Sequence, residues 1–143
     1  MTFLLDVNIL IALIDRSHVD SSRAHAWFAR EGRHSFATCP LTENGVLRIV
    51  GGPRYPTPHG SASAVLPALE ALCALPGHVF WPDAISLRDQ QHLVRRRLLS
   101  SGDVTDIYLL ALAVANVGRL ATFDRKIPTE AVPDGAAALC LLT

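Results

Sequence analysis

The sequence lacks any apolar run long enough to cross a membrane. Its longest uninterrupted apolar stretch, residues 107–115, is less than half of the ~20 residues that a membrane-spanning helix needs. The N-terminus has no basic segment, and Asp6 interrupts its first apolar run, which argues against a signal peptide. We therefore expect a cytoplasmic protein that does not associate with membranes.

The chain also lacks an excess of charge of either sign. Lys and Arg together number 13, as do Asp and Glu, so bulk positive charge cannot be what brings a nucleic acid to this protein. The three cysteines have no CxxC spacing, which fits reduced, buried thiols better than a disulfide framework. The six histidines show none of the paired spacing that is typical of zinc sites. Any nucleic-acid binding must then rest on a local patch or on a bound metal ion.

Apolar residues, in contrast, are plentiful. Hydrophobic residues make up 50% of the 143 residues and charged residues 18%, which favours a packed core over intrinsic disorder. The chain contains no internal repeat, and the Gly/Pro-rich stretch 51–58 lies between helical patterns, as a long surface loop does. We expect residues 1–143 to form one domain.

Short, continuously apolar segments alternate with segments of helical periodicity. The expected strands lie at residues 2–5, 35–39, 78–81, 119–123 and 138–142. The expected helices lie at residues 7–14, from 20 or 21 onward, and at 40–50, 61–75, 87–99 and 103–117. Pro67 either kinks the fourth of these helices or marks its true start. Apolar strands that alternate with helices predict an α/β fold with a mainly parallel central sheet covered on both faces.

Two of the apolar strands are followed by an aspartate, Asp6 and Asp124. In parallel α/β sheets, ligands bind beyond the carboxyl ends of the strands, where these two acids are expected. Glu43 and Asp106 lie in the first turns of two predicted helices, and these helices begin at the same edge. Taken singly, each acid has an ordinary explanation as a helix cap, a turn residue or a partner of a helix dipole. Taken together, they predict a shared site.

A cluster of four carboxylates predicts a bound cation. Two like charges ~4 Å apart repel by about 4 kcal/mol at an effective dielectric constant of ~20. Several such pairs would exceed the whole stability of a typical domain, ~5–15 kcal/mol, unless protons or a cation neutralise them. All-oxygen ligation suits Mg²⁺ or Mn²⁺ better than zinc, and such an ion activates water and binds phosphodiesters.

The four acids lie in four short motifs spread along the chain. In chain order these are Leu4 to Asn8, Pro40 to Glu43, Val104 to Ala113 and Ala121 to Asp124. Each motif is weak alone, but together, in this order and spacing, they resemble PIN-domain ribonucleases, specifically the VapC-type toxins of bacterial toxin–antitoxin modules. The resemblance covers essentially the whole chain.

The resemblance implies a three-layer α/β/α PIN-like fold, with a mainly parallel sheet of about five strands. It also implies an endoribonuclease that depends on Mg²⁺ or Mn²⁺, in which a metal-activated water attacks an RNA phosphodiester and leaves 5′-phosphate and 3′-hydroxyl ends. The implied partners are a small cognate antitoxin that covers the active site and a second copy of the chain. The implied catalytic and metal-binding residues are Asp6, Glu43, Asp106 and Asp124.

Other polar residues are candidates for supporting roles. Asn8 and Thr122 match flanking polar positions of the family, which support the acids or orient the substrate. Asp103 either joins the site or caps the helix that follows it. Arginine suits phosphate geometry, so RNA contacts are expected from a group of surface arginines that otherwise form a solvated face. These are Arg95, Arg96, Arg97 and, more weakly, Arg54.

Three other classes of protein share part of this pattern. Phosphoacceptor receiver domains have adjacent acids after the first strand, whereas here Val7 and Asn8 follow Asp6. Haloacid-dehalogenase-like phosphatases have an Asp-x-Asp motif, and position 8 is Asn. From a different functional class, a non-catalytic PIN-like module would bind RNA or act as a scaffold. Such a module is expected to have lost some of the four acids, all of which are present here.

Overall fold

The computed structural model describes residues 1–56 and 58–143, so Thr57 of the predicted 51–58 loop lies outside the described residues. Five strands form one sheet in the order β3-β2-β1-β4-β5, and every neighbouring pair is parallel. The strands are β1 (Phe3–Leu5), β2 (Phe36–Thr38), β3 (His78–Phe80), β4 (Arg119–Thr122) and β5 (Leu139–Leu141). The predicted five-stranded parallel sheet is confirmed.

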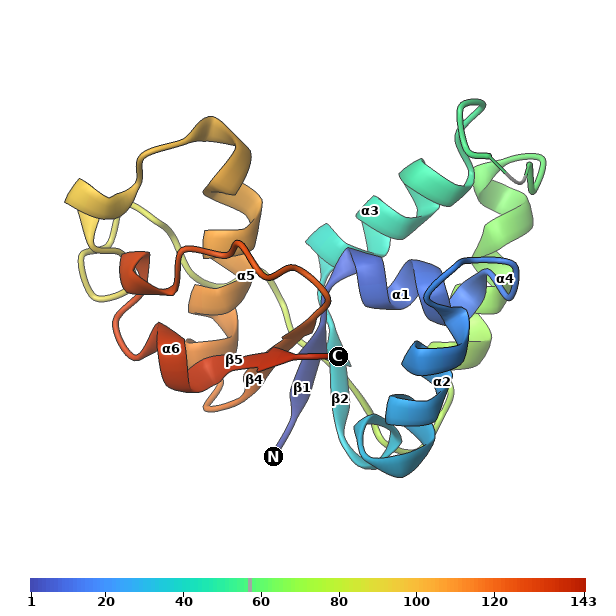
Figure 1. Cartoon of the computed structure of the whole chain (residues 1–143), viewed down its shortest axis with the longest axis horizontal. Helices are drawn as coiled ribbons and strands as arrows, with labels where there is room; N and C mark the ends of the chain where they lie inside the picture. Colours follow the sequence, from blue (N-terminus) through green and yellow to red (C-terminus); the bar gives the residue numbers. More distant parts are fainter. Residues whose placement is uncertain (57) are drawn as a thin grey trace.

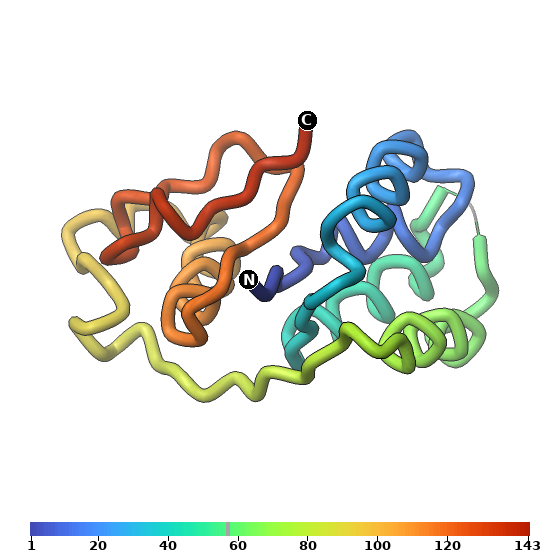
Figure 2. The backbone as a smooth tube through the Cα atoms, turned by 90° about the horizontal axis from the view of Figure 1, so that it is seen from below, coloured from blue at the N-terminus to red at the C-terminus, as the bar shows by residue number. Residues whose placement is uncertain are grey.

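Helices cover both faces of this sheet (Figure 1). One group consists of α1 (Val7–Ile14), α2 (Ser21–Arg30), α3 (Pro40–Val50) and α4 (Ala62–Cys73), and the other of α5 (Val104–Ala115) and α6 (Gly135–Ala138). Figure 2 shows the two groups on opposite sides of the strands, with the yellow-green segment after β3 crossing from one group to the other. The three-layer α/β/α arrangement is therefore as predicted. Among the described helices, none is both long and apolar enough to cross a bilayer.

The two faces of the sheet bury two separate apolar cores. Along β1, Phe3 and Leu5 pack with the α1–α4 group, whereas Leu4 packs with α5, because successive side chains of a strand point to opposite faces. Asp6 continues the extended backbone with ψ 157°, so the same alternation directs its side chain toward α5. The strand thus determines which face receives the acid.

The helices that follow β1 and β2 begin at the carboxyl edge of the sheet. Asp6 is the N-cap of α1, and Pro40 opens α3, where a missing backbone N–H costs nothing. Gly45 allows α3 to approach α1 closely, since a Cβ at this position would lie 2.8 Å from a methyl carbon of Val7. Glu43, in the first turn of α3, is therefore held at this edge.

Two predictions about helices need correction. The predicted helix at 87–99 is wrong: this segment consists of turns, with a single 3₁₀ turn at Arg95–Arg97. The apolar residues of this segment do not form a face that packs against the protein, because only Leu93 is buried while Leu99 is 78% exposed. Helix α4 begins at Ala62 and runs through Pro67, so this proline does not mark the start of the helix.

Candidate functional site

Asp6 is buried between the ends of β1 and β4, with only 6% of its surface exposed. One carboxylate oxygen accepts a hydrogen bond from the backbone N–H of Val7 at 2.7 Å, and the other accepts one from the Thr122 hydroxyl at 2.7 Å. Burial raises the pKa of the Asp6 carboxyl above its usual value, and these two hydrogen bonds offset only part of that effect. The negative charge of Asp124 raises this pKa further.

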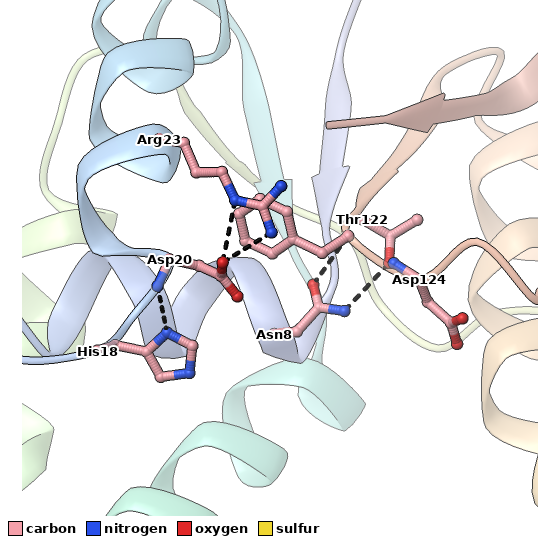
Figure 3. A network of polar contacts seen from close by, with 7 residues as sticks. Asn8, His18, Asp20, Arg23, Thr122 and Asp124 are labelled. Atoms are coloured by element: carbon pink, nitrogen blue, oxygen red, sulfur yellow. Dashed lines mark hydrogen bonds and ion pairs between the residues drawn. The ribbon is translucent and has the colours of Figure 1, made fainter. Parts of the chain in front are cut away.

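The Thr122 hydroxyl connects the strand ends. Besides donating to Asp6, it accepts hydrogen bonds from the Asn8 amide at 3.2 Å and from the Asp124 backbone N–H at 3.0 Å. The Asn8 oxygen also accepts a hydrogen bond from the backbone N–H of Phe123 at 3.4 Å, and Figure 3 shows Asn8 beside Thr122 and Asp124. Asn8 and Thr122, the two predicted supporting residues, therefore lie in one hydrogen-bonded network with Asp6 and Asp124.

Asp106, in the first turn of α5, lies within the electrostatic reach of the same acids. Its pKa is raised to about 6, first by burial and then by the negative charges of Asp6 and Asp124. A side-chain hydrogen bond with Asp124 and the charge of Asp103 raise the pKa further. The Asp106 carboxyl is therefore coupled to its neighbouring acids and keeps its proton to a higher pH than an isolated aspartate does.

Asp103 occupies the N-cap position of α5, yet within the described residues its side chain makes no capping hydrogen bond. Its charge instead contributes to the raised pKa of Asp106. Of the two roles left open for this residue, the structure gives no support to the side-chain cap and places its charge beside the acidic site.

Three of the predicted acids thus form one cluster, which we call the aspartate cluster: Asp6, Asp106 and Asp124. Its donors are carboxylate oxygens, the ligands that Mg²⁺ and Mn²⁺ prefer. Burial is the main cause of the raised pKa values of Asp6 and Asp106, and repulsion from neighbouring aspartates adds to it, an effect that a divalent cation would relieve. The donor set and its electrostatics therefore fit a hard divalent ion.

Glu43 makes its contacts one strand farther along the sheet. Its carboxylate accepts a 2.6 Å hydrogen bond from the Thr38 hydroxyl at the end of β2, and Cys73 and His78 lie nearby. Burial is the main cause of the raised pKa of Cys73 and the lowered pKa of His78, and the charge of Glu43 pushes both pKa values upward. In the described part of the chain, the charges that raise the pKa values of Asp6 and Asp106 are those of other aspartates. Among the described residues, the side-chain neighbours of Glu43 are therefore Thr38, Cys73 and His78 and not the aspartates.

The sequence did not indicate two groups of side-chain contacts that lie near these acids. Cys73 and His78 carry no paired spacing, and only the packing of α4 against β3 brings them to Glu43. On the other side, the Arg23 guanidinium lies 4.3 Å from the centre of the Phe123 ring and forms an ion pair with Asp20 at 2.7 Å (Figure 3). Nothing in the spacing of α2 pointed to this contact.

The predicted RNA-binding arginines lie on the surface. Arg95, Arg96 and Arg97 are exposed in their 3₁₀ turn, where the Arg95 guanidinium donates to the backbone oxygen of Arg88 at 2.9 Å. Arg54 is exposed in the 51–58 loop. No hydrogen bond or ion pair among the described residues joins these arginines to the aspartate cluster.

Comparisons with known proteins agree with this architecture. A model of the PIN domain family matches residues 3–131. The chain is 46% identical over 133 residues to ribonuclease VapC44 of Mycobacterium tuberculosis, covering 93% of each protein. It is 39% identical over 141 residues to ribonuclease VapC38 of the same species, covering 98% of this chain and 97% of the relative.

Two solved structures share the fold at low sequence identity. One is VapC20 of Mycobacterium tuberculosis, described as a sarcin-ricin loop cleaving toxin, with a TM-score of 0.65, 10% identity and coverage of 92% and 97%. The other is VapBC2 from Rickettsia felis bound to a DNA fragment from its promoter, with a TM-score of 0.57, 14% identity and coverage of 94% and 95%.

Proposed function

The chain belongs to the PIN domain family, and from this premise we propose that it is a toxin endoribonuclease of the VapC type. The structural observation that carries the proposal is the aspartate cluster, in which the negative charges of buried Asp6 and of Asp124 act on Asp106 at the carboxyl edge of a parallel sheet. The identity to ribonucleases VapC44 and VapC38 over nearly the whole chain supports the same conclusion.

Asp6, Asp106 and Asp124 are the residues proposed to hold Mg²⁺ or Mn²⁺. When bound, such an ion activates a water molecule and neutralises charge on the scissile phosphodiester. The chain prepares for this by fixing Asp6 from two sides, through the Val7 N–H and the Thr122 hydroxyl. Because the pKa of Asp106 is about 6, most Asp106 carboxyl groups have lost their proton at neutral pH and are available as ligands.

The remaining acids have subsidiary places in the proposal. Asp103 adds negative charge beside Asp106 and so strengthens the attraction for a cation. Glu43 is proposed as the fourth acid of the site, and it joins the aspartates only when its carboxylate leaves the Thr38 hydroxyl. Asn8 orients Thr122 and, through it, Asp6.

Binding partners follow from the same proposal. The substrate is RNA, whose phosphates are proposed to meet exposed arginines through bidentate contacts. A small antitoxin is proposed to cover the aspartate cluster, as the toxin–antitoxin pairing of the VapBC2 relative suggests. A homodimer and a cytoplasmic location complete the proposal. The arginines in question are Arg95, Arg96, Arg97 and Arg54.

The test is incubation of the purified protein with a panel of RNAs in Mn²⁺ and, separately, in EDTA. Cleavage is expected in Mn²⁺ only. Asp6→Asn should lower the cleavage rate by more than ~100-fold, because loss of a residue that only supports a metal ligand costs up to ~100-fold and Asp6 is proposed as a ligand itself. Asp89→Asn is the matched control, because Asp89 is exposed and its side chain is paired with His92. Absence of metal-dependent cleavage on every RNA would instead favour the non-catalytic, scaffold-type module.

A further inference from the structure

Glu43, Cys73 and His78 form a second group of potential ligands, which we call the mixed cluster. They come from three elements, namely α3, the last residue of α4 and the first residue of β3. One donor atom from each side chain lies within 4.8 Å of the others, and all three residues are half-buried and so open to solvent on one side.

The three side chains already surround a common point. The Thr38 hydroxyl oxygen lies 2.6 Å from a Glu43 carboxylate oxygen, 2.7 Å from His78 Nε2 and 3.8 Å from Cys73 Sγ. Thr38 is completely buried, so its hydroxyl forms the floor of the group. Three potential ligands therefore lie around one buried polar atom.

The donor chemistry differs from that of the aspartate cluster. Thiolate, imidazole and carboxylate together are the ligand types of zinc and similar transition-metal ions, whereas Mg²⁺ and Mn²⁺ select oxygen donors. With metal–ligand bonds of ~2.0–2.3 Å, tetrahedral ligands lie roughly 3.5 Å apart, so the most distant of these donors must draw in by about 1 Å. Half-exposed side chains accommodate such a movement more easily than buried ones do.

We propose that Glu43, Cys73 and His78 bind a zinc-class divalent ion at a site separate from the aspartate cluster. The three residues supply the protein ligands, and water completes a tetrahedral shell. Binding releases the Cys73 thiol proton to solvent, because the thiolate is the ligand. The ion also holds Glu43 beside Thr38 and away from the aspartates, so zinc inhibits cleavage. This last consequence rests on the proposed function, whereas the site itself does not.

Titration of the full chain with Co²⁺ tests the site directly, because a cobalt–thiolate bond gives a charge-transfer absorption that oxygen ligands do not. We expect this absorption in the wild type and in Cys140→Ser, a matched control with a half-buried thiol in β5. Cys73→Ser should abolish it and His78→Gln should weaken Co²⁺ binding by at least ~10-fold. Zn²⁺ should displace the cobalt. An absorption that survives Cys73→Ser, or none in the wild type, would overturn the proposal.

Two further readouts separate this site from the proposed function. Asp6→Asn should retain the cobalt absorption, since the aspartate cluster supplies no ligand to it. Micromolar Zn²⁺ should inhibit Mn²⁺-dependent RNA cleavage by the wild type at least ~10 times more than cleavage by Cys73→Ser, each measured against its own zinc-free rate. Equal inhibition would contradict the link between the clusters. If the wild type cleaves no RNA, the proposed function and the inhibition both fail, and the cobalt spectrum alone decides on the site.

Discussion

The aspartate cluster and the mixed cluster are built in the same way but from different donors. Each includes residues that hydrogen-bond to the hydroxyl of a completely buried threonine at the end of a strand, Thr122 in β4 and Thr38 in β2. Thr122 donates to Asp6 and accepts from the backbone N–H of Asp124, whereas the Thr38 hydroxyl contacts Glu43, His78 and Cys73. Both clusters lie at the carboxyl edge of the sheet, and their donor atoms determine which metal ion each cluster prefers.

Removing the two threonine hydroxyls separately is the change with the largest expected effect. Thr122→Val should weaken Mn²⁺ binding by ~10–100-fold, since the hydroxyl fixes Asp6 and the backbone of Asp124. Thr38→Val should change Mn²⁺ affinity by less than ~5-fold, about the value of one ordinary hydrogen bond. Calorimetric titration with Mn²⁺ measures both, and Thr122→Ser should recover most of the affinity. Equal losses from the two valine variants would contradict the separation of the clusters.

The aspartate cluster was predictable because its signals are local. A buried apolar strand followed directly by an acid marks the carboxyl edge, and both Asp6 and Asp124 lie where this rule places them. The position of Glu43 in the first turn of α3 was equally evident. Its side-chain partners were not, because they depend on how α4 packs against β3, residues 30 to 35 positions farther along the chain.

A pH titration of stability sharpens the comparison with a smaller effect. The pKa of Asp106 is about 6 in the folded protein and 3.8 for an unperturbed aspartate, so between these pH values the folded state binds more protons than the unfolded state. Stability contributed by this group is therefore present below pH ~4 and is lost as pH rises to ~6. After discounting for solvent screening, we expect the loss to be roughly 1 kcal/mol, or about 4 °C in Tm.

Differential scanning calorimetry in metal-free buffer at pH 4.5 and pH 7 measures this loss. Asp106→Asn should remove it, so that the wild type gains about 4 °C relative to the variant at the lower pH. Stabilisation by Mn²⁺ should depend on pH in the opposite direction, because protons and the metal compete for Asp106. The rise in Tm caused by Mn²⁺ should therefore shrink below pH ~6. A wild type whose stability relative to Asp106→Asn does not change with pH would argue against coupled carboxylates.

The segment at 87–99 shows where periodicity misleads. Its spacing of apolar residues fits a helix, but the chain here is anchored by Leu93 and by a hydrogen bond from the Val94 N–H to the Ala131 oxygen at 2.8 Å. A helix needs a continuous apolar face packed against the protein, and this segment buries only one side chain, that of Leu93. The sequence pattern carried no information about that missing surface.

The smallest expected effect concerns Arg95, Arg96 and Arg97. These exposed side chains lie outside both clusters, so replacing all three with Ala should leave Mn²⁺ affinity unchanged and weaken RNA binding. If all three meet phosphates of single-stranded RNA, the slope of log affinity against log salt should fall by about 2, at ~0.7 per contact. Filter binding with the uncleaved RNA and Asp6→Asn protein gives this slope. An unchanged slope would remove these arginines from the proposed RNA surface.

The most direct test of the account is a crystal grown with Mn²⁺ and measured for anomalous scattering. We expect an anomalous peak bounded by the carboxylates of Asp6, Asp106 and Asp124 in the wild type, and its loss in Asp106→Asn. Manganese bound only beside Glu43 and His78, or no ordered manganese at millimolar concentration, would contradict the assignment of the aspartate cluster as the metal centre of the nuclease.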